Sequence, residues 1–223
     1  AAALRATDPL LPLLAATFGT TAGRASAVIT AFAIGYGFLQ VVMGPIGDRI
    51  GKYRMVFLVT AVSAAGNLAC AFAPSLPWLV AGRFVTGATV GAIVPLSIAW
   101  IGDSVAQDKR QQVLARFLIG HMIGIALAAT ASGWLGERHG WPAVFFALTA
   151  LYVVIAALLW AELRSNPAAR QAAAGEPLAA AFRRMAALTR RPWVRVMLGT
   201  VFFEGALLYG GLAFAAYHAY TRF

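Results

Sequence analysis

The sequence predicts an all-α protein that crosses a membrane several times, from its composition and from a series of long charge-poor runs. Of its 223 residues, 61% are hydrophobic and only 12% are charged, and the mean hydropathy is +0.75. Soluble domains usually have about 45–50% apolar and about 25% charged residues. This composition excludes a water-soluble domain, a disordered chain and a disulfide-rich scaffold. The single cysteine, Cys70, rules out an internal disulfide and a cysteine-based metal site.

The charge-poor runs predict seven helical segments. A spanning helix needs about 20 apolar residues with few charges. Six runs meet this criterion, and a shorter apolar stretch at the start is interpreted as the outer part of a truncated first span. All six tryptophans lie near predicted segment ends, as expected for a side chain that favours the membrane–water interface. The segments cover about 1–18, 26–46, 55–73, 78–101, 113–135, 141–161 and 194–218.

The distribution of basic residues predicts the orientation of these segments. Thirteen of the 18 lysine and arginine residues lie in or beside the connections after the second, fourth and sixth segments, and three lie on the opposite side. Basic residues concentrate in cytoplasmic loops, so these three connections are expected to be cytoplasmic. Topology thus accounts for the net charge of +10, and nucleic acid is not an expected partner.

The longest connection divides the chain into domains. Pro177 can start a helix, and apolar side chains then recur at helical spacing beside several arginines, at Leu178, Phe182, Met185 and Leu188. Two interpretations stay open: an amphipathic helix on the inner leaflet or a loose basic linker. The expected domains are an N-terminal six-helix bundle, a cytoplasmic linker and the first span of a second bundle, at 1–161, 162–193 and 194–223.

The connection after the second segment carries a signature motif. It reads Gly44-Pro45-Ile46-Gly47-Asp48-Arg49-Ile50-Gly51-Lys52-Tyr53-Arg54. This run resembles the G-x-x-x-D-R-x-G-[RK]-[RK] signature of the major facilitator superfamily, and it lies between two spans as it does in that family. Its glycines permit a tight turn, and the resemblance implies that its charged residues latch the two halves of the protein in the outward-facing state. The latch candidates are Gly44, Gly47, Asp48, Arg49, Gly51, Lys52 and Arg54.

Other stretches extend the resemblance over the whole chain. Asp8-Pro9 with Pro12 resembles the first span of the drug:proton antiporter-like branch of the family. The fourth segment resembles the R-x-x-x-G pattern, and the loop after it resembles the family's acidic–basic inner loop. The entry to the sixth segment resembles a G-W-R-x-x-F pattern, with proline in place of arginine. These stretches are Gly82-Arg83-Phe84-Val85-Thr86-Gly87, Asp103 to Arg110, and Gly140-Trp141-Pro142-Ala143-Val144-Phe145.

The resemblance implies a secondary transporter with twelve spans, of which this chain supplies the N-terminal half and span 7. Such a protein moves a small organic solute by alternating access, with efflux of drug-like or metabolite substrates as the default expectation. A proton is the expected coupling ion, and no catalytic residue, metal or resident cofactor is expected. The expected partners are the solute, the lipid bilayer and the remaining C-terminal bundle, in a bacterial inner membrane.

Ionisable residues inside the first and fourth segments are candidates for proton coupling. A charge at mid-bilayer costs about 2.5–3.5 kcal/mol on insertion scales, so such groups are expected to pair or to face water. Asp8 and Arg5 fall near mid-depth, and Arg83 lies nearer the outer edge but can reach inward. We expect Asp8 and Arg83 to approach each other, with Arg5 as a second cation. A static structural ion pair is the open alternative.

Further candidates lie on the second, fifth and seventh segments. Glu204 falls near mid-depth and is expected to titrate in the substrate cavity, or to be a neutral or arginine-paired structural group. His121 is either a cavity residue or a neutral histidine that is hydrogen-bonded within the bundle. Tyr36 and Gln40 share one helix face and are expected to line the cavity.

The sequence excludes two other classes of function and leaves a third open. The only lysines, Lys52 and Lys109, lie in predicted loops, which excludes a retinal Schiff base. The three histidines are too scattered for a metal centre. A non-transporting membrane scaffold or assembly protein stays the alternative from another class.

Two small-residue pairs, Gly87-x-x-x-Gly91 and Gly120-x-x-x-Gly124, are expected to let helices approach closely.

Overall fold

The computed structural model describes residues 2–167, 169, 177–205 and 207. Within these residues the regular structure is helical, without β-strands. Internal contacts divide the chain into one unit over 1–175 and a second over 176–223, and each is described by itself.

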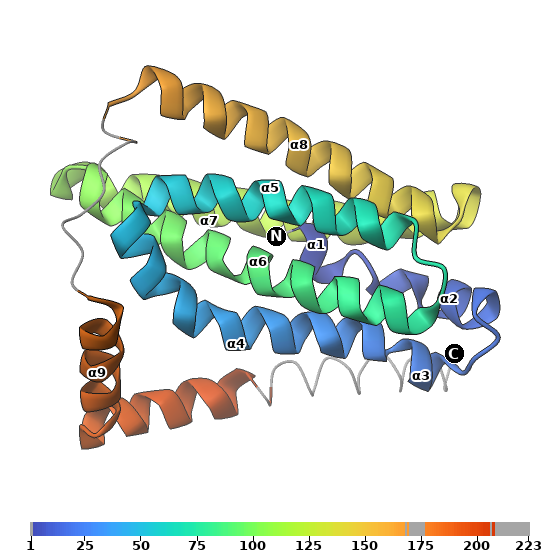
Figure 1. The fold of residues 1–223 in the computed structure, drawn as a ribbon, viewed down its shortest axis with the longest axis horizontal. Coiled ribbons are helices and arrows are strands. Elements are labelled where there is room, and N and C mark those ends of the chain that lie inside the picture. Colours follow the sequence, from blue (N-terminus) through green and yellow to red (C-terminus); the bar gives the residue numbers. More distant parts are fainter. Residues whose placement is uncertain (1, 168, 170–176, 206, 208–223) are drawn as a thin grey trace. The chain divides into compact units, whose positions relative to one another are not determined.

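Long helices make up the first unit and run alongside one another in alternating directions (Figure 1). Five helical segments in the described part of the chain are long and apolar enough to cross a membrane. They confirm the second to sixth segments expected from the sequence. These helices are α4 (Ala27–Ile50), α5 (Lys52–Ala71), α6 (Leu76–Ser104), α7 (Gln107–His139) and α8 (Trp141–Ser165).

The stretch predicted as the outer part of a first span is instead broken into short helices. These are α1 (Ala2–Arg5), the 3₁₀ helix η1 (Asp8–Leu10) and α2 (Leu11–Thr17). Pro9 and Pro12 lie in the first turns of η1 and α2. Proline lacks an N–H group and collides with the preceding turn, so it starts a helix but does not continue one. A fourth short helix, α3 (Ala22–Ala25), then leads into α4.

The described residues of the second unit form two helices. The first is α9 (Leu178–Thr189), and the next is described over 192–205. The latter covers the first part of the predicted seventh segment, whose remainder from residue 208 lies outside the described residues.

Glycines set the closest helix contact, which joins α4 and α6. A Cβ atom on Gly87 would collide with the backbone of Phe32, and one on Gly91 would lie 2.5 Å from the carbonyl oxygen of Tyr36. From the other side, a Cβ on Gly35 would collide with the carbonyl oxygen of Phe84. The predicted packing role of Gly87 and Gly91 is therefore confirmed. Gly120 behaves differently, because a Cβ there would meet no described atom within 4 Å.

Two further glycines form the tight turns between antiparallel helices. Gly51 joins α4 to α5 with φ of 103°, and Gly140 joins α7 to α8 with φ of 82°. Residues with a side chain rarely adopt this left-handed backbone conformation. Both turns therefore depend on glycine, as the sequence predicts for Gly51.

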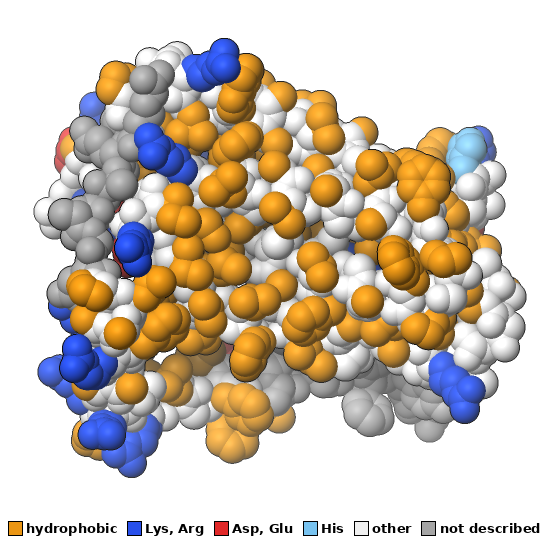
Figure 2. Space-filling view, viewed as in Figure 1, with side chains coloured by type: hydrophobic (Ala, Val, Ile, Leu, Met, Phe, Trp, Pro, Cys, Tyr) orange, Lys and Arg blue, Asp and Glu red, His pale blue; other side chains and the backbone are white. Residues whose placement is uncertain are grey.

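The surface supports a membrane environment for these helices. Large apolar side chains lie exposed along them, among them Phe38 at 71%, Met122 at 68% and Leu158 at 66%. On the face drawn in Figure 2, hydrophobic side chains cover the middle of the helices and basic side chains gather toward their ends. Such extensive apolar surface is unfavourable in water but is suited to lipid.

The α4–α6 contact yields a test of the fold. Gly87→Ala places a methyl group against the backbone of Phe32, which cannot turn aside like a flexible side chain. Overpacking of this kind destabilises by about 1–3 kcal/mol, and a lower midpoint of SDS-induced unfolding is expected. Gly37→Ala on α4 is the matched control, since its Cβ would meet no described atom within 4 Å. Equal effects of the two changes would contradict the close α4–α6 contact.

Candidate functional site

Arg83 of α6 is the largest fully buried side chain of the described structure. Its Nη2 donates hydrogen bonds to the carbonyl oxygen of Ala3, at 3.1 Å, and to Oγ1 of Thr7, at 3.3 Å. Its guanidinium carbon lies 3.9 Å from the centre of the Phe32 ring on α4. A cation over an aromatic face is stabilised by about 2 kcal/mol when both are desolvated. Arg83 thus ties α6 to both α4 and the broken N-terminal stretch.

Only part of the hydrogen-bonding capacity of the Arg83 guanidinium group is used. Its Nε and Nη1 atoms are buried and have no hydrogen-bond partner among the described atoms. A buried cation without full compensation is strongly unfavourable. Three groups lie within electrostatic range: the Cys70 thiol, the Tyr152 hydroxyl and the Asp8 carboxyl group. Two nitrogen atoms of Arg83 therefore remain without a hydrogen-bond acceptor among the described atoms.

A polar row on α5 and α6 adjoins this arginine. Ser63 and Thr89 join α5 to α6 through hydroxyl oxygens 2.7 Å apart. Asn67 is fully buried and donates from Nδ2 to the carbonyl oxygen of Ser63 at 2.7 Å. Its Oδ1 atom, like the two nitrogens of Arg83, has no partner among the described atoms. The core between these helices is therefore polar and incompletely paired.

The acidic group of the first segment pairs with its sequence neighbour. Arg5 Nη1 lies 3.0 Å from Asp8 Oδ2, and the two side chains are 38% and 32% exposed. Residues three apart face each other on one helical turn, so this pair forms locally. Arg83 reaches the same stretch, but its hydrogen-bond partners there are Ala3 and Thr7 rather than Asp8. Asp8 and Arg83 therefore lie within electrostatic range of each other, as predicted, whereas the ion pair of Asp8 is formed with Arg5, the predicted second cation.

The remaining predicted cavity residues are spread over several helices. The Arg83 group consists of Arg83 and the side chains around it, Phe32, Thr7, Cys70 and Tyr152. Tyr36 stacks on Phe32 with ring centres 6.1 Å apart, which places it next to this group. Gln40 lies one turn further along α4, and His121 lies on α7; both are half-buried. Glu204 is exposed on the helix over 192–205 of the second unit. Within the described ranges, no three His, Cys, Asp or Glu side chains gather into a possible metal site.

Sequence reasoning missed several members of the Arg83 group. Phe32, Thr7, Cys70 and Tyr152 were not assigned to a site, although each faces this arginine. Their sequence signals are weak, because a single aromatic or small polar residue in an apolar run is common in any helical bundle.

A second cluster, the Lys52 cluster, joins the ends of three helices. Lys52 at the start of α5 lies 3.2 Å from Asp48 on α4 and also contacts Asp103 on α6. The Tyr53 and Trp100 rings pack edge to face beside it, with centres 4.9 Å apart. These pairs connect α4, α5 and α6 at one end of the bundle.

The other latch candidates play different structural parts in this cluster. Arg49 and Arg54 are exposed, and Gly51 makes the turn. A Cβ on Gly47 would collide with Leu96 of α6, whereas one on Gly44 would meet no described atom within 4 Å. Of the three glycines in the motif, Gly51 is therefore required by its left-handed backbone conformation, and a side chain at Gly47 would have to displace the end of the Leu96 side chain.

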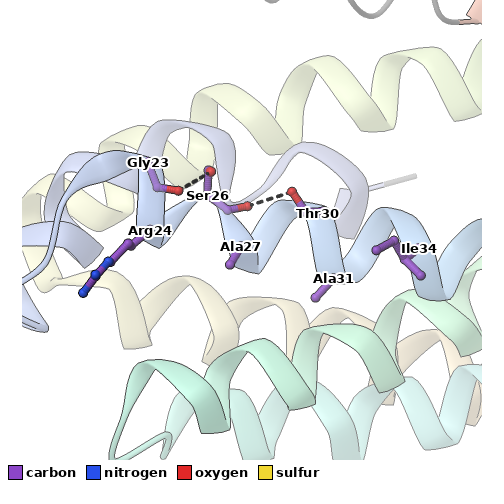
Figure 3. Close-up of a pocket in the computed structure, with 7 residues that line it drawn as sticks. All are labelled: Gly23, Arg24, Ser26, Ala27, Thr30, Ala31 and Ile34. Atoms are coloured by element: carbon purple, nitrogen blue, oxygen red, sulfur yellow. Dashed lines mark hydrogen bonds between the residues drawn. The ribbon is translucent and has the colours of Figure 1, made fainter.

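A shallow depression of about 520 Å³ lies away from both groups, along α3 and the start of α4 (Figure 3). It is lined by Gly23, Arg24, Ser26, Ala27, Thr30, Ala31 and Ile34. The hydroxyl groups of Ser26 and Thr30 donate to the carbonyl oxygens of Gly23 and Ser26, at 2.7 and 3.3 Å. Because these donors are used within the helix, the depression is suited to helix packing rather than to polar substrate recognition.

Comparison with known proteins agrees with this architecture. The family model described as "Major Facilitator Superfamily" matches residues 1–222. The uncharacterized transporter YgaY of Escherichia coli O157:H7 is 30% identical over 156 residues, which cover 70% of this chain and 39% of YgaY. The gallate transporter of Pseudomonas putida is 29% identical over 174 residues, with 77% and 39% covered. The chain therefore spans about two fifths of the length of these relatives.

A solved structure shows the same fold. The transporter PepTSo of the POT family superposes with a TM-score of 0.68 at 22% sequence identity, over 79% of this chain and 37% of that one. The relatives from Escherichia coli and Pseudomonas putida are both named as transporters. Together, the five long apolar helices and the family match over nearly the whole chain show that this is an integral membrane protein belonging to the major facilitator superfamily.

Proposed function

We propose that the protein is a proton-coupled secondary transporter that moves a small organic solute by alternating access. The observation that carries this proposal is Arg83, a fully buried guanidinium with two nitrogens lacking acceptors among the described atoms. A buried charge in a membrane bundle is costly, and such residues usually mark a transport or proton pathway. Family membership supports the same function and lends no support to a non-transporting scaffold.

The coupling step is proposed to be an exchange of partners at the N-terminal stretch. Ionised Asp8 holds Arg5, while Arg83 is held by Ala3 and Thr7. Protonation of Asp8 removes the attraction between Asp8 and Arg5, and it also lowers the negative charge near Arg83. Because this stretch consists of short helices interrupted by proline, it is suited to rearrange when these contacts change.

The substrate cavity is proposed to lie beside this group. Tyr36 adjoins it through Phe32, and Gln40 follows on the same face of α4. His121 on α7 is a further candidate for proton transfer within the cavity, and Glu204 of the second unit is a separate candidate for proton transfer. Efflux of drug-like or metabolite compounds is the default direction and substrate class, and gallate, named for one relative, is a second probe.

The Lys52 cluster is proposed to act as the conformational latch. Asp48 and Asp103 both contact Lys52, so one lysine couples the ends of three helices. The density of basic residues supports a cytoplasmic location for this end in a bacterial inner membrane.

Replacement of Arg83 tests the buried cation. Arg83→Gln is expected to lower pH-gradient-driven flux of ethidium or gallate in proteoliposomes by about tenfold or more, equivalent to about 1.4 kcal/mol. Arg83→Lys keeps the positive charge but loses the planar guanidinium group with its several N–H donors, so this variant is expected to be only partly active. Arg24→Gln, at an exposed arginine, is the control. Normal gradient-driven flux in folded Arg83→Gln protein would contradict the proposal.

Neutralisation of Asp8 tests the coupling step. Asp8→Asn imitates the protonated carboxyl group permanently, so flux of the same probes should no longer respond to the pH gradient, although exchange down the probe's own gradient continues. Asp108→Asn, in the first turn of α7, is the matched control and should behave as the unmodified protein. A full pH response in Asp8→Asn would remove Asp8 from the proton path.

Replacement of Lys52 tests the latch. Lys52→Gln breaks contacts with Asp48 and Asp103, whose side chains are more than half exposed. Exposed ion pairs contribute up to about 1 kcal/mol, so a small fall in thermal stability is expected, and the fall should shrink as salt increases. Lys109→Gln is the control, with no expected change. If both variants unfold alike, Lys52 does not hold the three helix ends together.

A further inference from the structure

Helix α9 of the second unit separates apolar and basic side chains by face. At 100° per residue, one sector of about 120° contains the apolar residues Leu178, Ala181, Phe182, Met185 and Leu188. Arg183 and Arg184 flank this sector, one on each side, and Arg190 and Arg191 follow directly after the last residue of the helix, Thr189. A helix with this pattern is suited to lie in a membrane interface, with its apolar face toward the acyl chains.

The charged side chains of α9 and of the residues that follow it, up to residue 203, are all basic. Residues 177–203 contain five arginines and no aspartate or glutamate. No acidic side chain within this run can neutralise them, so the complementary surface must carry negative charge. Guanidinium groups match the oxygens of a phosphate group in geometry as well as in charge.

The chain turns a sharp corner after α9, so the next helix runs across it (Figure 1). Thr189 ends α9, and the next helix begins at residue 192. Arg195 Nη2 donates to the carbonyl oxygen of Arg190 at 2.7 Å. This bond satisfies a carbonyl group at the end of α9 and braces the corner.

The helix after the corner is suited to cross the bilayer. Most of its exposed side chains are apolar and lie on several faces, at Val196, Met197, Leu198, Val201, Phe202 and Phe203. Arg195, Thr200 and Glu204 are the exposed polar residues of its described part. A helix that is hydrophobic all round belongs in lipid or in a core. Trp193 lies at its start and is 71% exposed, which places the corner at the membrane–water interface. If this helix crosses the bilayer, α9 lies along its surface.

We propose that α9 is an interfacial helix that binds anionic phospholipid headgroups. Its apolar sector inserts among the acyl chains at the interface, and Arg183, Arg190 and Arg191 contact lipid phosphates. Each cation near an anionic surface contributes about 1 kcal/mol, so each arginine strengthens association about fivefold at low salt. This role is independent of the transported solute and of the Arg83 group.

The orientation of α9 is tested with single reporters in the full chain. In a Cys70→Ala background, Met185→Cys on the apolar face and Ala187→Cys on the opposite face are labelled with an environment-sensitive nitrobenzoxadiazole dye. The protein is reconstituted in nanodiscs of phosphatidylglycerol or of phosphatidylcholine. In phosphatidylglycerol, we expect blue-shifted emission and protection from dithionite at position 185, and water-like emission at 187. In phosphatidylcholine, the difference between the two positions should diminish.

The arginines are tested in the same assay. Arg183→Gln, Arg190→Gln and Arg191→Gln together should weaken phosphatidylglycerol binding about a hundredfold and make position 185 behave as it does in phosphatidylcholine. The triple lysine variant retains the charge and should restore protection. Protection of position 185 in both lipids would mean that α9 packs on protein, and water exposure in both would mean a loose linker. Either result overturns the proposal, as would an unchanged triple glutamine variant.

Discussion

A charge buried in an apolar bundle is the constraint on which the first unit depends. Arg83 cannot lie inside these helices unless its guanidinium is held on several sides. The structure provides a backbone carbonyl group, a hydroxyl group and an aromatic face. These partners come from the N-terminal stretch and from α4, so the position of one side chain fixes how two other elements pack against α6.

The glycine contact and the cation contact are parts of one arrangement. Gly87 lies one turn after Arg83, and its missing side chain allows the backbone of Phe32 to approach α6. The same Phe32 turns its ring onto the guanidinium group. Close packing between α4 and α6 therefore supplies the desolvated aromatic face that the buried cation requires. Tyr36, stacked on Phe32, extends this group along α4 toward Gln40.

The candidate site was predictable only in part. Arg83 and Asp8 stand out in the sequence because a charge within an apolar run is costly. Arg5, which pairs with Asp8, stands out for the same reason. The partners of Arg83 do not stand out, because Thr7, Ala3 and Phe32 carry no charge. The choice among neighbouring acceptors depends on a few ångströms of helix position, and the prolines that break the first segment alter that position.

Local features of the sequence were enough to predict the long helices, the turn at Gly51 and the two ends of the bundle. Hydropathy defined the five long helices, the left-handed turn at Gly51 required glycine, and the alternation of basic loops marked two ends of the bundle. Only the tertiary structure decided which helix faces meet, so that Gly87 packs tightly while Gly120 faces open space among the described residues. In lipid, apolar side chains are favourable on every face of a helix. The hydrophobic pattern therefore carries little information about rotation, which close packing and buried polar contacts must decide instead.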